Sequence, residues 1–207
     1  VYVIPSNIQV TVETPEGEII TQIRHIESTG ADYDKLNYLN AMSRYVCSHN
    51  PDEKELVRRF KKVMARPDQS ELITGLAQIT GGTAFAVFFG CDLQDAVVAL
   101  IVCLMIVLVG RWLSRREGNP MIYNLILAFL SEVVIVTAVR SGLGHHPDRI
   151  MIGIVMLLVS ALGAINGMRD VMQRNFISGS LEVMNSMLGA FGIAFGIALA
   201  MMLMGNI

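Results

Sequence analysis

One acidic residue inside a long apolar segment is the clearest candidate for chemistry in this sequence. Glu132 lies near the centre of the segment Pro120–Gly142. Asn124, Ala128 and Glu132 recur at intervals of four residues, so they share one face of a helix. Ionisable groups are costly in lipid and usually have a purpose there. Glu132 therefore either lines a path for a substrate or a proton, or holds helices together as a protonated or hydrogen-bonded carboxyl group.

A second group of polar residues lies around the link between the last two apolar segments. The predicted substrate-binding residues are Asn166, Arg169, Asp170, Glu182 and Asn185. An arginine beside a carboxylate can anchor a helix at the membrane surface or recognise a substrate, and both interpretations stay open.

Small residues follow the same two segments at helical spacing. The predicted helix-packing residues are Gly163, Gly167, Gly189, Gly192 and Gly196. Glycines four residues apart let the backbones of two helices approach closely. The last apolar segment therefore presents one stripe of glycines, which favours a tight packing seam between helices.

Other chemistry finds little support. Adjacent histidines in the loop His145-His146-Pro147-Asp148 make a poor metal site without further ligands nearby, so we predict no metal. The three cysteines lack metal-ligand spacing. Nothing resembles a phosphate-binding loop, a nucleophile elbow or a zinc-protease helix, so we predict neither a cofactor nor an enzyme activity.

The elements that must position these residues are five apolar segments, each near the roughly 20 residues that cross a bilayer. They are Leu72–Gly90, Asp95–Leu113, Pro120–Gly142, Arg149–Met172 and Gly179–Met204. Hydrophobic residues make up 53% of the 207 residues and charged residues only 16%, too few to solubilise five buried helices. The fold class is thus a mainly α integral membrane protein, with five transmembrane helices in residues 69–207.

Residues 1–68 are predicted to form a small α+β domain on the cytoplasmic side. Apolar and polar residues alternate on both sides of the turn Thr14-Pro15-Glu16-Gly17, which is typical of a β-hairpin. The spacing predicts a helix over Asp32–Val46 and a second one with Asn50 as N-cap and Pro51 at its first position.

Charge indicates the orientation and the partners. The leading domain carries nine Lys and Arg residues and the tail after Met204 none, which predicts a cytoplasmic N-terminus and an external C-terminus. The second helix has a basic face formed by Lys54, Arg58, Arg59, Lys61 and Lys62. A net charge of −2 argues against nucleic acid, so this face favours anionic lipid.

Several stretches together resemble one known family. They are Lys35-Leu36-Asn37-Tyr38-Leu39-Asn40-Ala41-Met42-Ser43-Arg44, Phe88-Phe89-Gly90-Cys91-Asp92-Leu93-Gln94-Asp95-Ala96, Asp148-Arg149-Ile150-Met151-Ile152-Gly153, Asn166-Gly167-Met168-Arg169-Asp170 and Ser178-Gly179. Across nearly its whole length the chain resembles the N-terminal half of the threonine/serine exporter family.

This resemblance implies the membrane subunit of a proton-coupled exporter, an antiporter, in the bacterial cytoplasmic (inner) membrane. The substrates would be threonine- or serine-type amino acids first, or C4 dicarboxylates such as succinate. Glu132 would then be the proton-coupling residue. Arg169 would pair with the carboxylate that both substrate classes carry, and Asp170 would pair with the α-amino group of an amino acid. The second membrane half would be a separate chain, as in the split two-subunit type, and homo-oligomers are compatible with this. The alternative is a membrane scaffold or regulatory subunit that transports nothing. A further helix is expected upstream of Val1.

One stretch departs from the family pattern. Where relatives have Pro-Gly in the fourth segment, this chain has Ser160-Ala161-Leu162-Gly163. Without the proline we expect the helix over Arg149–Met172 to run unkinked.

Overall fold

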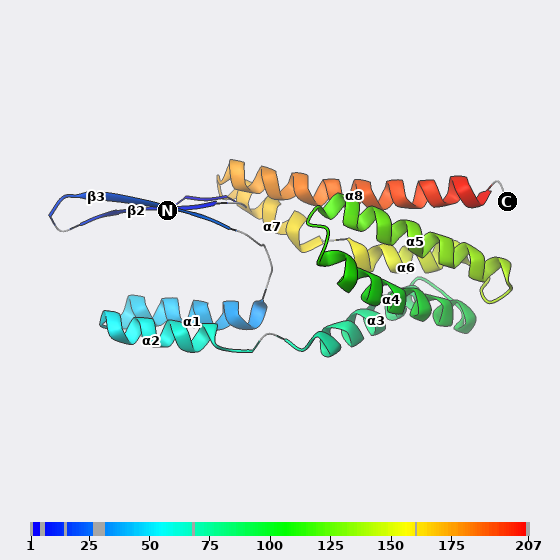
Figure 1. Cartoon of the computed structure of the whole chain (residues 1–207), viewed down its shortest axis with the longest axis horizontal. Helices are drawn as coiled ribbons and strands as arrows, with labels where there is room; N and C mark the ends of the chain where they lie inside the picture. Colours follow the sequence, from blue (N-terminus) through cyan, green and yellow to red (C-terminus); the bar gives the residue numbers. More distant parts are fainter. Residues whose placement is uncertain are drawn as a thin grey trace. The chain divides into compact units, whose positions relative to one another are not determined.

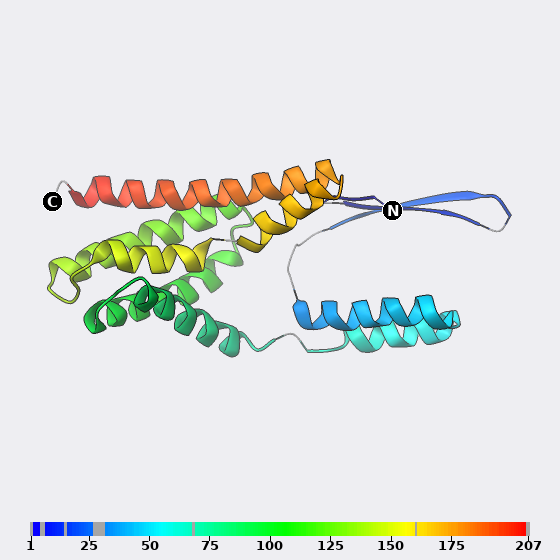
Figure 2. The same cartoon turned by 180° about the vertical axis from the view of Figure 1, so that it is seen from behind.

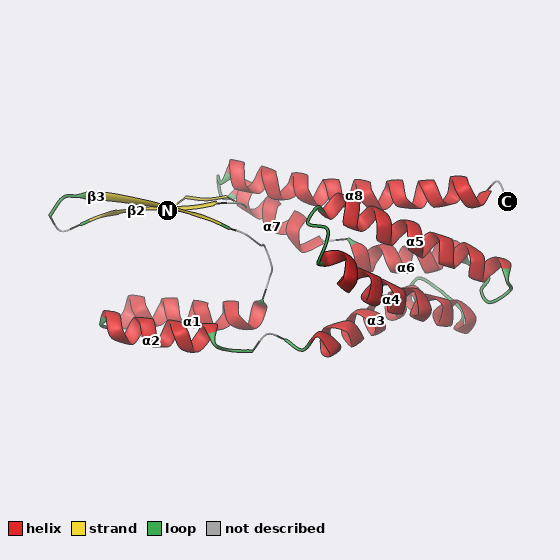
Figure 3. Cartoon of the chain, viewed as in Figure 1, coloured by secondary structure: helices red, strands yellow, loops and turns green. Residues whose placement is uncertain are grey.

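A computed structural model describes residues 2–4, 7–14, 16–26, 32–67, 69–159 and 161–205. Pro15 in the predicted turn and Ser160 in the fourth segment lie outside these residues. The chain divides into two compact units, one mainly Ser6–Glu71 and the other mainly Leu72–Ile207. Helices dominate the second unit, and the strands all lie near the N-terminus (Figure 3).

The strands form one small sheet in the order β1 (Tyr2–Ile4), β2 (Asn7–Glu13) and β3 (Ile19–His25). Strands β2 and β3 are antiparallel, with Thr11 opposite Thr21 and their hydroxyl oxygens 3.0 Å apart. The predicted hairpin is therefore confirmed.

Two helices follow the sheet, α1 (Tyr33–His49) and α2 (Glu53–Met64). The predicted N-cap of the second helix is wrong, because Asn50 ends α1 in the left-handed conformation with φ 47° and Asp52 is the N-cap of α2. Asparagine tolerates that conformation at a helix C-terminus better than most residues.

The described part of the second unit contains six helices. They are α3 (Glu71–Phe88), α4 (Leu93–Ser114), α5 (Pro120–Arg140), α6 (Pro147–Leu158), α7 (Ala161–Met172) and α8 (Phe176–Gly205). Helix α8 lies along α5 and α7, as Figures 1 and 2 show from opposite sides. At 30 residues it is about 45 Å long, so it exceeds the thickness of the hydrocarbon core.

Three single helices among the described residues are long and apolar enough to cross a membrane: α4, α5 and α8. The pair α6 and α7 adds a fourth span if the two are counted together. Helix α3, which covers the first predicted span, does not meet the same criterion, so five spans are not confirmed.

The fourth span is broken, which corrects the expectation of an unkinked helix. Helix α6 ends at Leu158, α7 begins at Ala161, and their axes differ by 52°. Val159 leaves the helix with φ −71° and ψ 123°. A β-branched residue readily adopts these extended angles, so the break needs no proline.

The core of this unit lies where α4, α5 and α6 meet. Its fully buried side chains include Val102 of α4, Leu127 of α5 and Ile154 of α6. Helix α3 contacts this core through Ala86, which packs on Gly153 of α6. A β-carbon on Gly153 would lie only 2.7 Å from the backbone of Ala86. The core thus packs α6 against α4 and α5.

Candidate functional site

Glu132 is the buried carboxyl group at the candidate site. It projects from the middle of α5, is only 2% exposed, and its Oε2 atom has no hydrogen-bond partner among the described residues. Buried polar atoms are nearly always hydrogen-bonded, so such an atom needs an explanation. A proton, a water molecule or a substrate group at Oε2 would supply one.

A pocket of about 360 Å³ opens beside this carboxyl group. Helices α5, α6 and α8 line it with Glu132, Val136, Arg140, Pro147, Asp148, Met151, Met201, Met204 and Gly205. Its walls are mostly apolar, and three charged residues provide the polar groups. An apolar cavity with a few convergent polar groups is the usual form of a small-molecule site.

The polar groups of the pocket lie at different depths. Arg140 is two turns after Glu132 on α5, about 12 Å along the helix axis, and it is exposed. Its guanidinium group donates a hydrogen bond to the carbonyl oxygen of Met204, which ties the ends of α5 and α8 together. Asp148 is also exposed. The pocket therefore has a buried carboxyl group and a charged rim.

The seam between α5 and α8 holds two walls of the pocket in place. Gly189, Gly192 and Gly196 of α8 are buried and face α5. A β-carbon on Gly192 would collide with the carbonyl oxygen of Met121, so only glycine allows this approach. Gly167 of α7 likewise packs on α8, and Gly163 is half-buried in α7.

The predicted substrate-binding residues lie elsewhere. Asn166 and Arg169 of α7 and Asn185 of α8 are exposed, whereas Asp170 and Glu182 are half-buried. None of these five residues lines the pocket beside Glu132. The structure brings Glu132 instead to Arg140 and Asp148, which the sequence analysis did not select. The spacing Glu132, Val136, Arg140 on one helix was the available signal.

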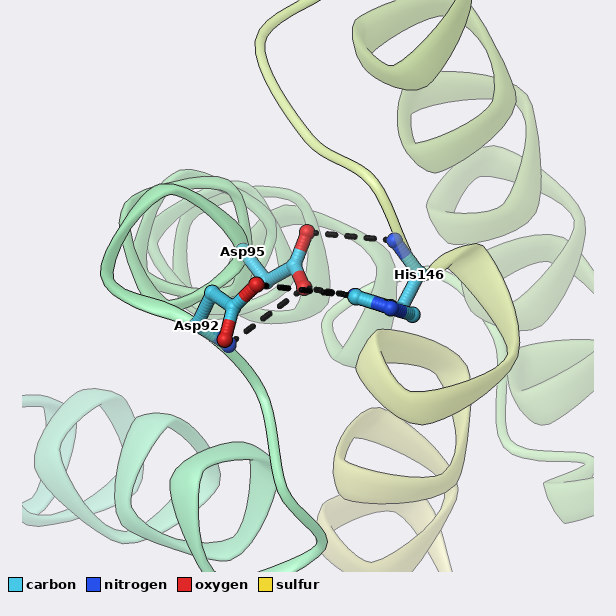
Figure 4. Close-up of side chains that lie close together, drawn as sticks. All are labelled: Asp92, Asp95 and His146. Atoms are coloured by element: carbon cyan, nitrogen blue, oxygen red, sulfur yellow. Dashed lines mark hydrogen bonds and ion pairs between the residues drawn. The ribbon is translucent and has the colours of Figure 1, made fainter.

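A second polar cluster joins the starts of α4 and α6 (Figure 4). Asp95 is fully buried, and its Oδ1 accepts hydrogen bonds from the backbone N–H groups of His145 (2.7 Å) and His146 (3.3 Å). Its Oδ2 lies 2.9 Å from Nδ1 of His146 and 3.4 Å from the backbone nitrogen of Asp92. An ionised carboxylate only accepts, so the proton of this imidazole is on Nδ1.

The side chains of Asp92, Asp95 and His146 also offer ligand atoms that a metal ion could use. Asp92 Oδ2 is 3.9 Å from His146 Nδ1. Four protein hydrogen bonds already occupy Asp95, however, and they explain its geometry without a metal. Sequence reasoning considered His146 but missed its partners. The acidic residues Asp92 and Asp95, three positions apart at the start of α4, form a capping box that could have indicated them.

The structure thus defines a helical membrane protein with a pocket among three helices. A family model described as "Putative threonine/serine exporter" matches residues 1–204, and the chain belongs to this family. The resemblance seen in the sequence is thereby confirmed, and the family is one of transporters rather than enzymes. Neither the curated proteins nor the solved structures contain a match to this chain.

Proposed function

We propose that this chain is the membrane subunit of a proton-coupled exporter, with Glu132 as the group that binds and releases the proton. The single observation that carries the proposal is the buried Oε2 atom of Glu132, which has no partner among the described residues and borders a pocket. A carboxyl group that must exchange protons has to be reachable by water and cannot be held permanently in hydrogen bonds. Membership of an exporter family supports transport as the purpose.

Threonine and serine are the favoured substrates, and C4 dicarboxylates such as succinate are the second class. The family description supports the amino acids. The charge of the pocket also favours amino acids over dicarboxylates, because an ionised Glu132 attracts an ammonium group and repels a dicarboxylate. The substrate would first be recognised at the other end of the path. The residues proposed for this are Asn166, Arg169 and Asp170 of α7, with Glu182 and Asn185 of α8.

The arrangement in the membrane is part of the proposal. We place the N-terminal unit in the cytoplasm of a bacterial cell and the C-terminus outside the cytoplasmic membrane. Helix α3 would be the fifth span, packed in the assembled exporter against its second half on a separate chain. The exposed polar side chains of α3, Gln78 among them, favour a protein partner over lipid there.

The test is efflux from cells that contain this chain together with its partner chain. Cells preloaded with labelled threonine, serine or succinate are given an inward proton gradient, and efflux is measured for the parent and for Glu132→Gln. We expect the variant to lose the acceleration by the gradient, because an amide cannot carry a proton. Ser131→Ala is the matched control, since Ser131 is equally buried and, among the described residues, its hydroxyl group bonds to Leu127 of its own helix.

The same measurements distinguish an exporter subunit from the scaffold alternative. A scaffold or regulatory subunit would give no substrate-dependent flux in reconstituted vesicles, with or without Glu132. Unchanged gradient-driven efflux in Glu132→Gln at equal expression would remove this residue from the mechanism. Efflux of succinate alone would assign the second substrate class.

A further inference from the structure

The start of α6 is held from one side by α4 and forms a pocket wall on its other side. His145 and His146 together make three hydrogen bonds to the buried carboxylate of Asp95. The residues that follow directly, Pro147 and Asp148, line the pocket beside Glu132. Any displacement of this helix end away from Asp95 must therefore change the shape of the pocket.

A further hydrogen bond strengthens the same connection. Arg149, in the first turn of α6, donates a hydrogen bond from Nη1 to the carbonyl oxygen of Gly90, with 2.6 Å between the atoms. Gly90 lies in the turn between α3 and α4. The start of α6 is thus tied both to the N-terminus of α4 and to the turn before it.

Helix α6 is also mechanically separate from the rest of its span. It has 12 residues, and its axis differs by 52° from that of α7. A continuous helix would carry a movement at one end through the whole membrane. Because α6 and α7 are distinct helices, α6 can change its position while α7 keeps its packing on α8.

We propose that the Asp95–His146 hydrogen bond is a latch that holds α6 against α4, and that its release widens the pocket beside Glu132. The inference rests on the proposed function, because it takes this pocket as the transport site. The latch is closed at rest, since moving the start of α6 away from α4 would remove three of the four hydrogen bonds of the buried Asp95 carboxylate. In the proposed orientation it lies at the external end of the path.

The experiment measures access to the pocket without any substrate. A reporter cysteine replaces Val136, which lines the pocket, in a chain whose Cys47 and Cys91 are changed to serine. Membranes containing the full chain and its partner are opened by sonication, so that both faces meet a polar thiol reagent. The rate of labelling at position 136 is then compared among variants of the latch.

His146→Ala removes the ring that donates to Asp95, and we expect labelling to become about tenfold faster, as the loss of one hydrogen bond to a charged group allows. His146→Asn keeps a donor near the position of Nδ1 and should restore the slow rate. His145→Ala is the matched control, because among the described residues the exposed His145 bonds to Asp95 through its backbone N–H, which the variant keeps.

An unchanged rate in His146→Ala, or an equal increase in His145→Ala, would overturn the proposal. Buried Cys103 reports on folding, because it reacts only if the core opens. If His146→Ala exposes Cys103, the test is made with His146→Gln, whose longer side chain displaces the amide donor from the position of Nδ1. The labelling rate at position 136 must then be higher in His146→Gln than in His146→Asn. Equal labelling rates in these two variants would refute the latch. Labelling needs no transport, so failed efflux in Glu132→Gln and a failed latch are separate results.

Discussion

Asn124 of α5 donates a hydrogen bond from Nδ2 to the backbone carbonyl oxygen of Gly189 in α8, across 3.3 Å in a buried position. This bond links two of the three helices that line the pocket. Asn124→Ala should lower the free energy of unfolding by about 1 kcal/mol, the usual scale of interhelical hydrogen bonds in membranes. The measurement is thermal unfolding in detergent. Asn185→Ala, at an exposed position of α8, should leave the midpoint unchanged.

Gly192 gives a sharper test of the same seam. Its backbone touches that of Met121, so Gly192→Ala forces α5 and α8 apart and should cost about 1–3 kcal/mol, as overpacking does. Gly118→Ala is the control, because a β-carbon at Gly118 meets no atom within 4 Å. If both variants unfolded at the same temperature as the parent, the close contact between these helices would be refuted. Loss of gradient-driven efflux is expected only in the Gly192 variant.

The break between α6 and α7 predicts a pattern of hydrogen exchange. The first N–H groups of a helix have no partner within it, so the amides of Leu162 and Gly163 at the start of α7 should exchange quickly. The amides of Val98–Val102 inside α4 should be protected by comparison. Residue-resolved hydrogen exchange of the protein in lipid nanodiscs measures both. Equal protection at the two places would show a continuous fourth helix.

Cys91 should show a shifted pH profile of alkylation. It lies in the turn before α4, where burial raises the pKa of its thiol above the ordinary 9.0 and the nearby Asp95 raises it further. Since the thiolate is the reactive form, the rate should be low at neutral pH and still increase above pH 9. The measurement is the rate of maleimide or iodoacetamide labelling in a Cys47→Ser chain.

The charge of Arg149 acts in the opposite direction on the pKa of this thiol. Arg149→Gln should therefore move the alkylation profile of Cys91 to still higher pH. A profile that stays in place, or that moves to lower pH, would mean that Arg149 does not stabilise the thiolate of Cys91. That result would contradict an electrostatic effect of Arg149 on Cys91.

Local features of the fold followed from the sequence because short-range spacing determines them. Alternation predicted the hairpin of β2 and β3, and long apolar runs predicted α4, α5 and α8, with ends that differ by a few residues. The stripe of Gly189, Gly192 and Gly196 indicated a seam, since residues three and four apart share a helix face. Glu132 could also be selected from the sequence alone. A carboxyl group in an apolar segment is unusual, and recognising it requires no knowledge of its spatial neighbours.

Tertiary structure alone decided which residues meet. Asp95 and His146 are 51 positions apart, and only the packing of α4 on α6 brings them within 2.9 Å. Met201 and Met204 reach the pocket of Glu132 because α8 packs along α5. The break at Val159, where the backbone angles become extended, also escaped prediction, because no proline marks it in the sequence. Spacing along one helix specifies a face, whereas the partner of that face depends on distant segments.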